Sequence, residues 1–163
     1  YSAAVRLNPL YGLAFRNRGR VHFYRADFAA AAEDFRNAAS GNRANAYSLL
    51  WYYVAGARAN VDDRAGLEQG LAALREEWPR PLVLHFLGRV SEADVMAAAA
   101  ADPAKRAERE CEAYFFLGQR RILAGAAADA IAVLRRALAI CPREIVEYDA
   151  TRMELTRLGA PPR

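Results

Sequence analysis

Two segments of the chain, residues 14–38 and 113–142, repeat one spacing of small and bulky apolar residues. In the first segment, offsets of 0, 4, 16, 20 and 23 residues are occupied by Phe15, Gly19, Ala31, Phe35 and Ala38. In the second segment, the same offsets are occupied by Tyr114, Gly118, Ala130, Leu134 and Ala137. Because the spacing recurs unchanged, it predicts pairs of antiparallel helices stacked into an array.

The small residues of this pattern fall where the two helices of a pair would cross. Gly19 and Gly118 have no side chain and so allow the two backbones to approach closely, while Ala31 and Ala130 do the same from the second helix. Glycine inside a helix costs about 0.5 to 1 kcal/mol relative to alanine, so its recurrence indicates that close packing compensates. The residues expected to fill the remaining space are Phe15, Phe35, Tyr114 and Leu134.

The five shared positions resemble the tetratricopeptide repeat (TPR), a helix-turn-helix unit of about 34 residues. The resemblance implies an all-α fold, in which antiparallel helix pairs form a right-handed superhelix closed by a C-terminal capping helix. An alternative is a set of ordinary helical pairs in an alanine-rich chain. Ten glycines and seven prolines, mostly between the periodic segments, agree with an all-helical chain.

The distance between the two glycines predicts an irregular part of the array. Gly19 and Gly118 are 99 residues apart, three fewer than three repeat periods. We therefore expect one helical repeat domain over residues 1–163, with two further helix pairs between the regular repeats. Its predicted parts are the end of a preceding repeat (1–9), a repeat (10–43), a repeat-like pair (44–79), an irregular helix pair (80–102), a second regular repeat (103–142), a capping helix (143–159) and a tail (160–163).

Aspartates mark the predicted starts of two helices. Asp62 and Asp63 precede a segment that we expect to be helical over residues 64–78, since acidic side chains satisfy free N–H groups at a helix start. Asp102 and the proline after it are expected to be the N-cap and first residue of a long helix over residues 103–124.

Other signals mark the remaining boundaries. Ser91 and Asp94 have the spacing of a capping box, which predicts a helix over residues 92–101. Ala4 and Pro9 have the spacing that closes a repeat, which predicts that the chain begins inside one and that a targeting segment lies upstream.

The irregular part carries a second resemblance, over residues 45–159. Its motifs are SLLWYYVAGARA, HFLGRVSEADVMAAAAADP, EAYFFLGQRRILAG and EYDATRMELTRLG. These resemble the bacterial NlpI-like lipoproteins, in which a short FYLG-like helix and a serine-started helix precede a repeat that again begins with FYLG. The matching residues here are Phe86, Leu87, Gly88 and Ser91, followed later by Phe115, Phe116, Leu117 and Gly118.

This resemblance implies an adaptor of the bacterial cell envelope. Members of the family face the periplasm, bind peptidoglycan hydrolases and proteases, and often form homodimers. The sequence departs from the family in lacking the lipid-attachment cysteine, so anchoring would depend on a segment upstream of residue 1. A cytoplasmic adaptor is the alternative.

The TPR resemblance also implies which side chains bind a partner, because the first helix of each repeat lines a concave groove. The candidate protein-binding residues are Arg16, Arg20, Tyr24, Tyr47, Leu50, Val54, Arg58, Phe115 and Gln119. The alternative role for these residues, which must hold for several of them, is packing against neighbouring helices.

Arg16 and Arg20 lie one helical turn apart, so their positive charges repel each other unless an anion lies between them. A groove that binds an acidic segment or a C-terminal carboxylate would use such a pair. The alternatives are a solvated basic face or internal ion pairs with Asp27, Glu33 or Asp34. Chaperone-binding TPR proteins carry an asparagine where this chain has a tryptophan at residue 51, so we do not expect their carboxylate clamp.

The net charge of +4 comes entirely from residues 1–45, which contain seven arginines and three acidic residues. Arginines interleaved with Phe23 and Tyr24 make nucleic-acid binding chemically feasible. The remaining residues carry no net charge, so there is no extended basic track. Nucleic-acid binding is therefore less favoured than protein binding.

Catalytic and metal sites are not indicated. The sequence has no HExxH, no GxSxG and no glycine-rich phosphate loop, and we expect His22 and His85 to pack or to cap rather than to act as bases. Two histidines and two cysteines without close spacing do not predict a zinc site. We expect no enzymatic activity, no metal and no cofactor, and we find no apolar run of about 18 residues that would predict a membrane span.

Cys111 and Cys141 are the two thiols of the chain. One would start the first helix of the second regular repeat and the other would end its second helix, so an antiparallel pair brings them towards each other. A disulfide is one interpretation, and two buried small apolar residues are the other.

Together these patterns favour a protein-interaction adaptor that binds a partner protein or peptide segment in a helical groove. The alternative is a structural homo-oligomerisation module whose apolar faces are buried between subunits.

Overall fold

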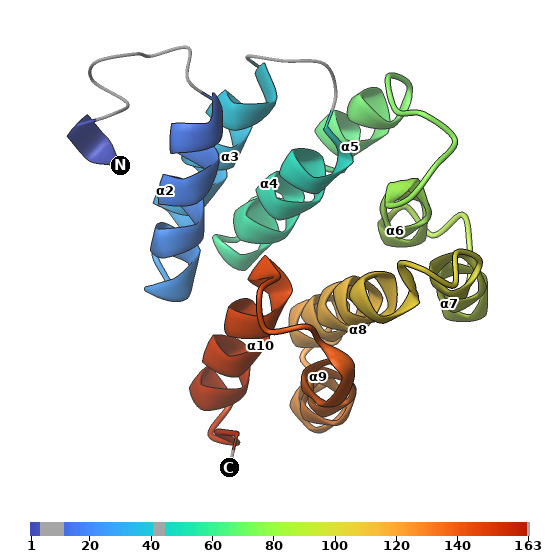
Figure 1. Cartoon of the computed structure of the whole chain (residues 1–163). Helices are drawn as coiled ribbons and strands as arrows, with labels where there is room; N and C mark the ends of the chain where they lie inside the picture. The colour runs from blue at the N-terminus through green and yellow to red at the C-terminus, as the bar shows by residue number, and fades with distance from the viewer. Residues whose placement is uncertain (4–11, 41–44, 163) are drawn as a thin grey trace. The chain divides into compact units, whose positions relative to one another are not determined.

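The computed structural model of the chain describes residues 1–3, 12–40 and 45–162, and within these ranges it contains nine helices and no strand (Figure 1). The helices are α2 (Gly12–Tyr24), α3 (Phe28–Ser40), α4 (Ala46–Arg58), α5 (Arg64–Leu71), α6 (Arg80–Phe86), α7 (Glu92–Ala100), α8 (Arg106–Leu123), α9 (Ala127–Ile140) and α10 (Val146–Arg157). The predicted all-α class is confirmed, and the helices are consistent with a TPR-like array. The predicted repeat end at Ala4 and Pro9 lies outside the described residues.

The chain divides into two compact units, residues 1–83 (unit 1) and 84–163 (unit 2). In unit 1, α3 packs against both α2 and α4, and α5 packs against α4. In unit 2, α8 and α9 form the main pair, with α7 against α8 and α10 against both α8 and α9. None of the described helices is both long and apolar enough to cross a membrane.

In unit 1 the helix crossing lies at Gly19, as the repeat pattern predicts. A Cβ added at Gly19 would lie 3.1 Å from Cε1 of Phe35 on α3, so the two helices leave no room for a larger residue without adjustment. Ala31 and Phe35 are fully buried. Trp51 of α4 completes this core, with its ring centroid 5.5 Å from that of Phe35.

The corresponding crossing in unit 2 lies at Gly118 and is tighter. A Cβ added at Gly118 would lie 2.6 Å from Cδ2 of Leu134 on α9. Ala130 and Leu134 are fully buried, whereas Tyr114 is partly buried and packs against a cluster at the far end of the pair. Both predicted crossings are therefore confirmed.

That cluster contains a disulfide between Cys111 and Cys141, whose Cα atoms are 4.9 Å apart. Cys111 lies in the second turn of α8 and Cys141 directly follows α9, so the bond joins the open ends of the helix pair. Ala137 and the partly buried Tyr148 pack around it. Of the two interpretations of these cysteines, the structure contains the disulfide.

Two predicted caps are confirmed. The side chain of Asp63 accepts a hydrogen bond from the backbone N–H of Gly66 at 2.9 Å and is the N-cap of α5. Ser91 and Asp94 form a reciprocal capping box at the start of α7, because each side chain accepts from the other's backbone N–H.

Two predicted helix boundaries were wrong. The helix expected over residues 64–78 ends at Leu71. Its buried face consists of Leu67 and Leu71, and among the next six residues only Leu74 is even partly buried, so a longer helix would bury little further apolar surface.

The helix expected from Pro103 begins at Arg106 instead. Asp102 closes a turn before it, since its carboxylate accepts from the N–H of Ala104 at 3.1 Å and its carbonyl from the N–H of Lys105 at 3.1 Å. Asp102 also lies 3.3 Å from the guanidinium of Arg109. An aspartate that caps its own turn no longer caps the helix.

Candidate protein-binding face

The structure divides the nine candidate binding residues by exposure. Four have no exposed surface and lie in the protein core: Leu50, Val54, Phe115 and Gln119. The other five are partly exposed, and all belong to two helices of unit 1: Arg16, Arg20, Tyr24, Tyr47 and Arg58. We define these five as the α2–α4 face. Both helices start at the same end of unit 1 (Figure 1).

Acidic side chains near α2 are engaged by residues other than Arg16. Asp34, which is buried, accepts two hydrogen bonds from the guanidinium of Arg18 at 2.6 and 2.8 Å. This bidentate pair raises the pKa of Arg18 above its usual value. His22 lies 3.2 Å from Asp27 and 3.9 Å from Asp34.

Arg16 has a different environment from Arg18. In the part of the chain that the structure describes, Arg16 forms no ion pair, and its Nε atom is buried without a hydrogen-bond partner. Arg20, one turn further along α2, donates to the side chain of Asn17 at 3.2 Å. The helix therefore presents a guanidinium at residue 16 whose hydrogen-bonding capacity is not used by a neighbouring acid.

Arg58 is the last residue of α4 and contacts the first residue of α3. Its guanidinium carbon lies 4.3 Å from the centroid of the Phe28 ring, a distance typical of a cation–π contact. Trp51 is 1% exposed and belongs to the core between α3 and α4, so it is not available to a ligand.

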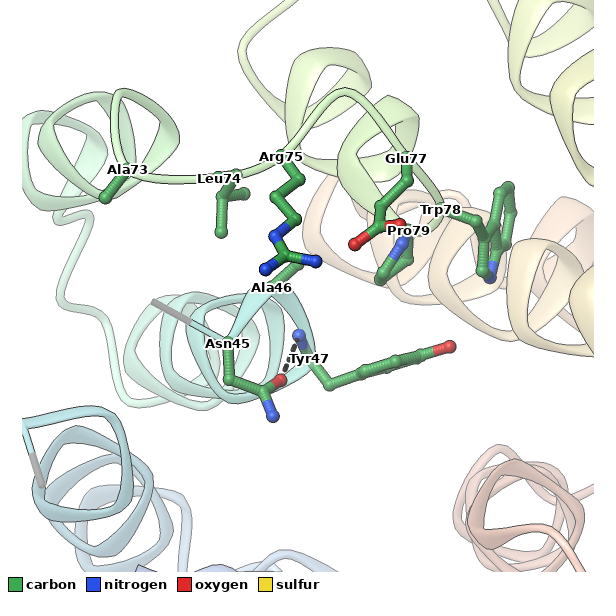
Figure 2. Close-up of a pocket in the computed structure, with 9 residues that line it drawn as sticks. All are labelled: Asn45, Ala46, Tyr47, Ala73, Leu74, Arg75, Glu77, Trp78 and Pro79. Carbon is green, nitrogen blue, oxygen red and sulfur yellow. Dashed lines mark hydrogen bonds between the residues drawn. The ribbon is translucent and has the colours of Figure 1, made fainter. Parts of the chain in front are cut away.

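Tyr47 borders a pocket of about 540 Å³ at the start of α4 (Figure 2). The far wall is the loop between α5 and α6, which contributes Leu74, Arg75, Glu77 and Trp78. This volume lies in the range of small-ligand and side-chain pockets in proteins. Figure 2 shows Arg75 and Glu77 extending from the loop towards α4.

Comparison with known proteins agrees with part of the sequence resemblance. No protein-family model matches the chain. The chain is similar to a protein named Lipoprotein NlpI homolog from Haemophilus influenzae, with 24% identity over 163 residues. The match covers 97% of this chain and 52% of that protein, so the chain spans about half the length of this relative.

The helix register predicts Tyr47 as a binding residue, but it does not predict the loop residues that face Tyr47 in the pocket. They fall within the segment that was expected to be helical, where no periodic signal distinguishes Arg75 or Trp78 from a solvated helix face. A tryptophan between an acidic residue and a proline, next to a run of charged residues, was the available signal. The described residues contain no group of three or more histidine, cysteine, aspartate or glutamate side chains placed to hold a metal ion.

Proposed function

We propose that the chain is a protein-interaction adaptor that binds an acidic segment of a partner protein along the α2–α4 face and has no enzymatic activity of its own. The observation that carries this proposal is that Arg16, which is partly exposed and lies one turn from Arg20, forms no ion pair among the described residues, whereas Arg18 is paired with Asp34. Two guanidiniums at this spacing can hold one carboxylate with charge-assisted hydrogen bonds. Tyr24, one turn beyond Arg20 on the same helix, adds partly exposed aromatic surface of the kind enriched in protein interfaces.

We further propose that the adaptor works in the bacterial cell envelope, on the periplasmic side. The disulfide supports this location, since disulfides persist in oxidising compartments. The name of the Haemophilus influenzae relative, a lipoprotein, agrees with it. Peptidoglycan hydrolases and proteases are the partners implied by the NlpI-like resemblance.

A binding experiment tests the α2–α4 face. The probe is a fluorescent peptide of alternating glutamate and alanine with a free C-terminal carboxylate, titrated with the native chain and with Arg16→Glu/Arg20→Glu. Because two attractive charges become repulsive, we expect the variant to bind about tenfold more weakly or worse.

The matched control is Arg135→Glu/Arg136→Glu, which reverses two exposed arginines of α9. Circular dichroism must show that both variants keep the native helix content. Equal affinity of the native chain and the α2 variant, or equal losses in both variants, would place the acidic segment elsewhere and overturn the proposal.

Self-association is a second candidate, favoured by apolar exposure on α2. Leu13 is 42% exposed and Val21 is 40% exposed, and both lie on the helix that carries Arg16 and Arg20. Light scattering of the native chain and of Leu13→Asp/Val21→Asp tests it. A dimer that the variant dissociates supports this candidate, and a native monomer at all concentrations excludes it.

A further inference from the structure

The pocket beside Tyr47 exists because unit 1 departs from a regular repeat. Since α5 stops at Leu71, the chain from residue 73 to residue 79 is free to fold over the start of α4 (Figure 2). Loops held by a rigid helical frame are common sites of recognition, because their side chains are not constrained by helix packing. None of the arginines on α2 lines this pocket, so its chemistry is set by residues 45–47 and 73–79.

Aromatic and proline side chains form the apolar part of the pocket. Tyr47 from α4 and Trp78 from the loop are both partly buried, and Pro79 and Leu74 lie beside them. Grooves lined by tyrosine and tryptophan rings recognise extended proline segments, which stack their rings on the aromatic faces. Such segments lose little conformational entropy on binding, since they are already extended.

The polar part of the pocket favours a ligand that accepts hydrogen bonds. The side-chain oxygen of Asn45, Oδ1, already caps α4, because it accepts hydrogen bonds from the backbone N–H of Tyr47 at 2.9 Å and of Ser48 at 3.3 Å. The side chain therefore retains its NH₂ group, a donor, and Arg75 adds a guanidinium that only donates. A proline offers a carbonyl and no N–H, so a proline segment matches this set of donors.

The charges around the pocket define the ligand further. Glu76 forms an ion pair with Arg80 at 3.0 Å, whereas Glu77 forms no ion pair within the described ranges of the chain. Glu77 lines the pocket and is exposed, so a cation in a bound segment can reach it.

We propose that this pocket binds an extended, proline-containing segment of a partner protein with a lysine or arginine beside the prolines. The proline rings stack on Tyr47 and Trp78, the segment's carbonyls accept hydrogen bonds from Arg75 and Asn45, and its cation pairs with Glu77. This inference rests on the proposed function, because it assigns a second contact to the same kind of partner.

The test uses the full 163-residue chain and an acetylated, amidated peptide of six prolines followed by one lysine. Binding is measured by titration calorimetry against the native chain, Trp78→Ala and Glu77→Lys. We expect Trp78→Ala to weaken binding about tenfold or more, as is usual for an aromatic side chain that a bound partner covers. We expect Glu77→Lys to reverse the charge preference, so that it binds a peptide ending in glutamate better than one ending in lysine.

Two controls make the outcome decisive. Glu108→Lys reverses an exposed acidic residue of unit 2 and should leave proline-peptide binding unchanged. A peptide with alanines in place of the prolines should bind at least about tenfold more weakly to the native chain. Equal binding of the two peptides, or proline-peptide binding that Trp78→Ala and Glu77→Lys leave intact, overturns the inference.

The same experiment separates this inference from the proposed function. Arg16→Glu/Arg20→Glu should lose the acidic peptide and keep the proline peptide. If the native chain binds the acidic peptide but not the proline peptide, the pocket assignment is overturned and the assignment of the α2–α4 face stands. If the native chain binds the proline peptide but not the acidic peptide, the proposed function is overturned, and the pocket remains as a binding site in its own right.

Discussion

The α2–α3 pair of unit 1 and the α8–α9 pair of unit 2 follow the same residue pattern but are reinforced in different ways. In unit 1 the pair is completed by a third helix, which inserts Trp51 against Phe23 and Phe35 with centroid distances of 5.0 and 5.5 Å. In unit 2 the disulfide closes the pair covalently. The repeat pattern therefore specifies how two helices cross, while the residues outside the pattern determine what stabilises each pair.

Both tryptophans of the chain, Trp51 and Trp78, lie in unit 1, which makes the comparison measurable. Tryptophan fluorescence reports the unfolding of unit 1, and circular dichroism reports the helices of both units. Changes confined to one unit should move one signal and leave the other transition in place.

The largest effect is expected from Trp51→Ala. Trp51 is 1% exposed, and its removal leaves a cavity between α3 and α4. Large-to-small substitutions of this kind cost about 3 to 5 kcal/mol, so we expect the chemical denaturation midpoint of unit 1 to fall steeply. The fluorescence of the remaining tryptophan, Trp78, measures this midpoint. A midpoint within error of the native value would show that the aromatic core does not hold unit 1 together.

The next effect concerns the disulfide. Replacing Cys111 and Cys141 by alanine should destabilise unit 2 by about 3.5 kcal/mol, because the cross-link restricts a loop of about thirty residues in the unfolded chain. The circular dichroism transition of unit 2 should move to lower denaturant while tryptophan fluorescence stays unchanged. If the circular dichroism and fluorescence transitions move together, the two units unfold as one, and the two helix pairs are not stabilised independently.

A smaller effect should distinguish the two crossing glycines. Gly118→Ala forces a Cβ to within 2.6 Å of Leu134, which we expect to cost about 1 to 3 kcal/mol through overpacking. Gly19→Ala meets its nearest neighbour at 3.1 Å, and the gain of about 0.5 to 1 kcal/mol in helix propensity should offset much of that strain. Thermal unfolding of the two variants checks the order. Equal losses would mean that the tighter approach in unit 2 is not energetically distinct.

The smallest effect is a pH dependence in unit 2. His85 is 6% exposed, donates from Nδ1 to the carbonyl of Val90 at 3.0 Å, and faces Glu92, Arg120 and Arg121. Burial, assisted by the charges of Arg120 and Arg121, lowers the pKa of His85 below its usual 6.5. The folded state therefore binds a proton less readily than the unfolded state, and stability is lost as the pH falls below about 6.5.

His85→Asn keeps a donor for Val90 and removes the titrating ring, so unit 2 of this variant should lose less stability between about pH 7.5 and pH 5 than the native chain. Unfolding at both pH values, followed by circular dichroism, measures the difference. Parallel losses in the two proteins would assign the pH dependence to other groups.

Sequence reasoning succeeded where a residue type has one structural use. A glycine inside a helical pattern indicated a crossing at both Gly19 and Gly118, and serine followed by aspartate indicated the cap of α7. It failed where one residue type has several uses. Asp102 could cap a helix or its own turn, and nothing in the local sequence separates the two.

The candidate face shows the same limit. Helix register predicts Arg16, Arg20 and Tyr47 as binding residues, but it does not determine their exposure. Leu50 and Val54 share the register of Tyr47 and are fully buried, because their exposure depends on which helices pack against α4. The loop side of the pocket depends on where α5 ends, and this was governed by buried apolar area rather than by helix propensity.

The position of the Cys111–Cys141 bond also has a mechanical consequence. A pulling force transmitted along the backbone from α7 to α10 enters the α8–α9 pair near Cys111 and leaves it after Cys141. The covalent bond carries that tension across a sequence separation of 30 residues, so the helix pair is shielded from being drawn out. Unit 2 would therefore keep its helical hairpin under tension.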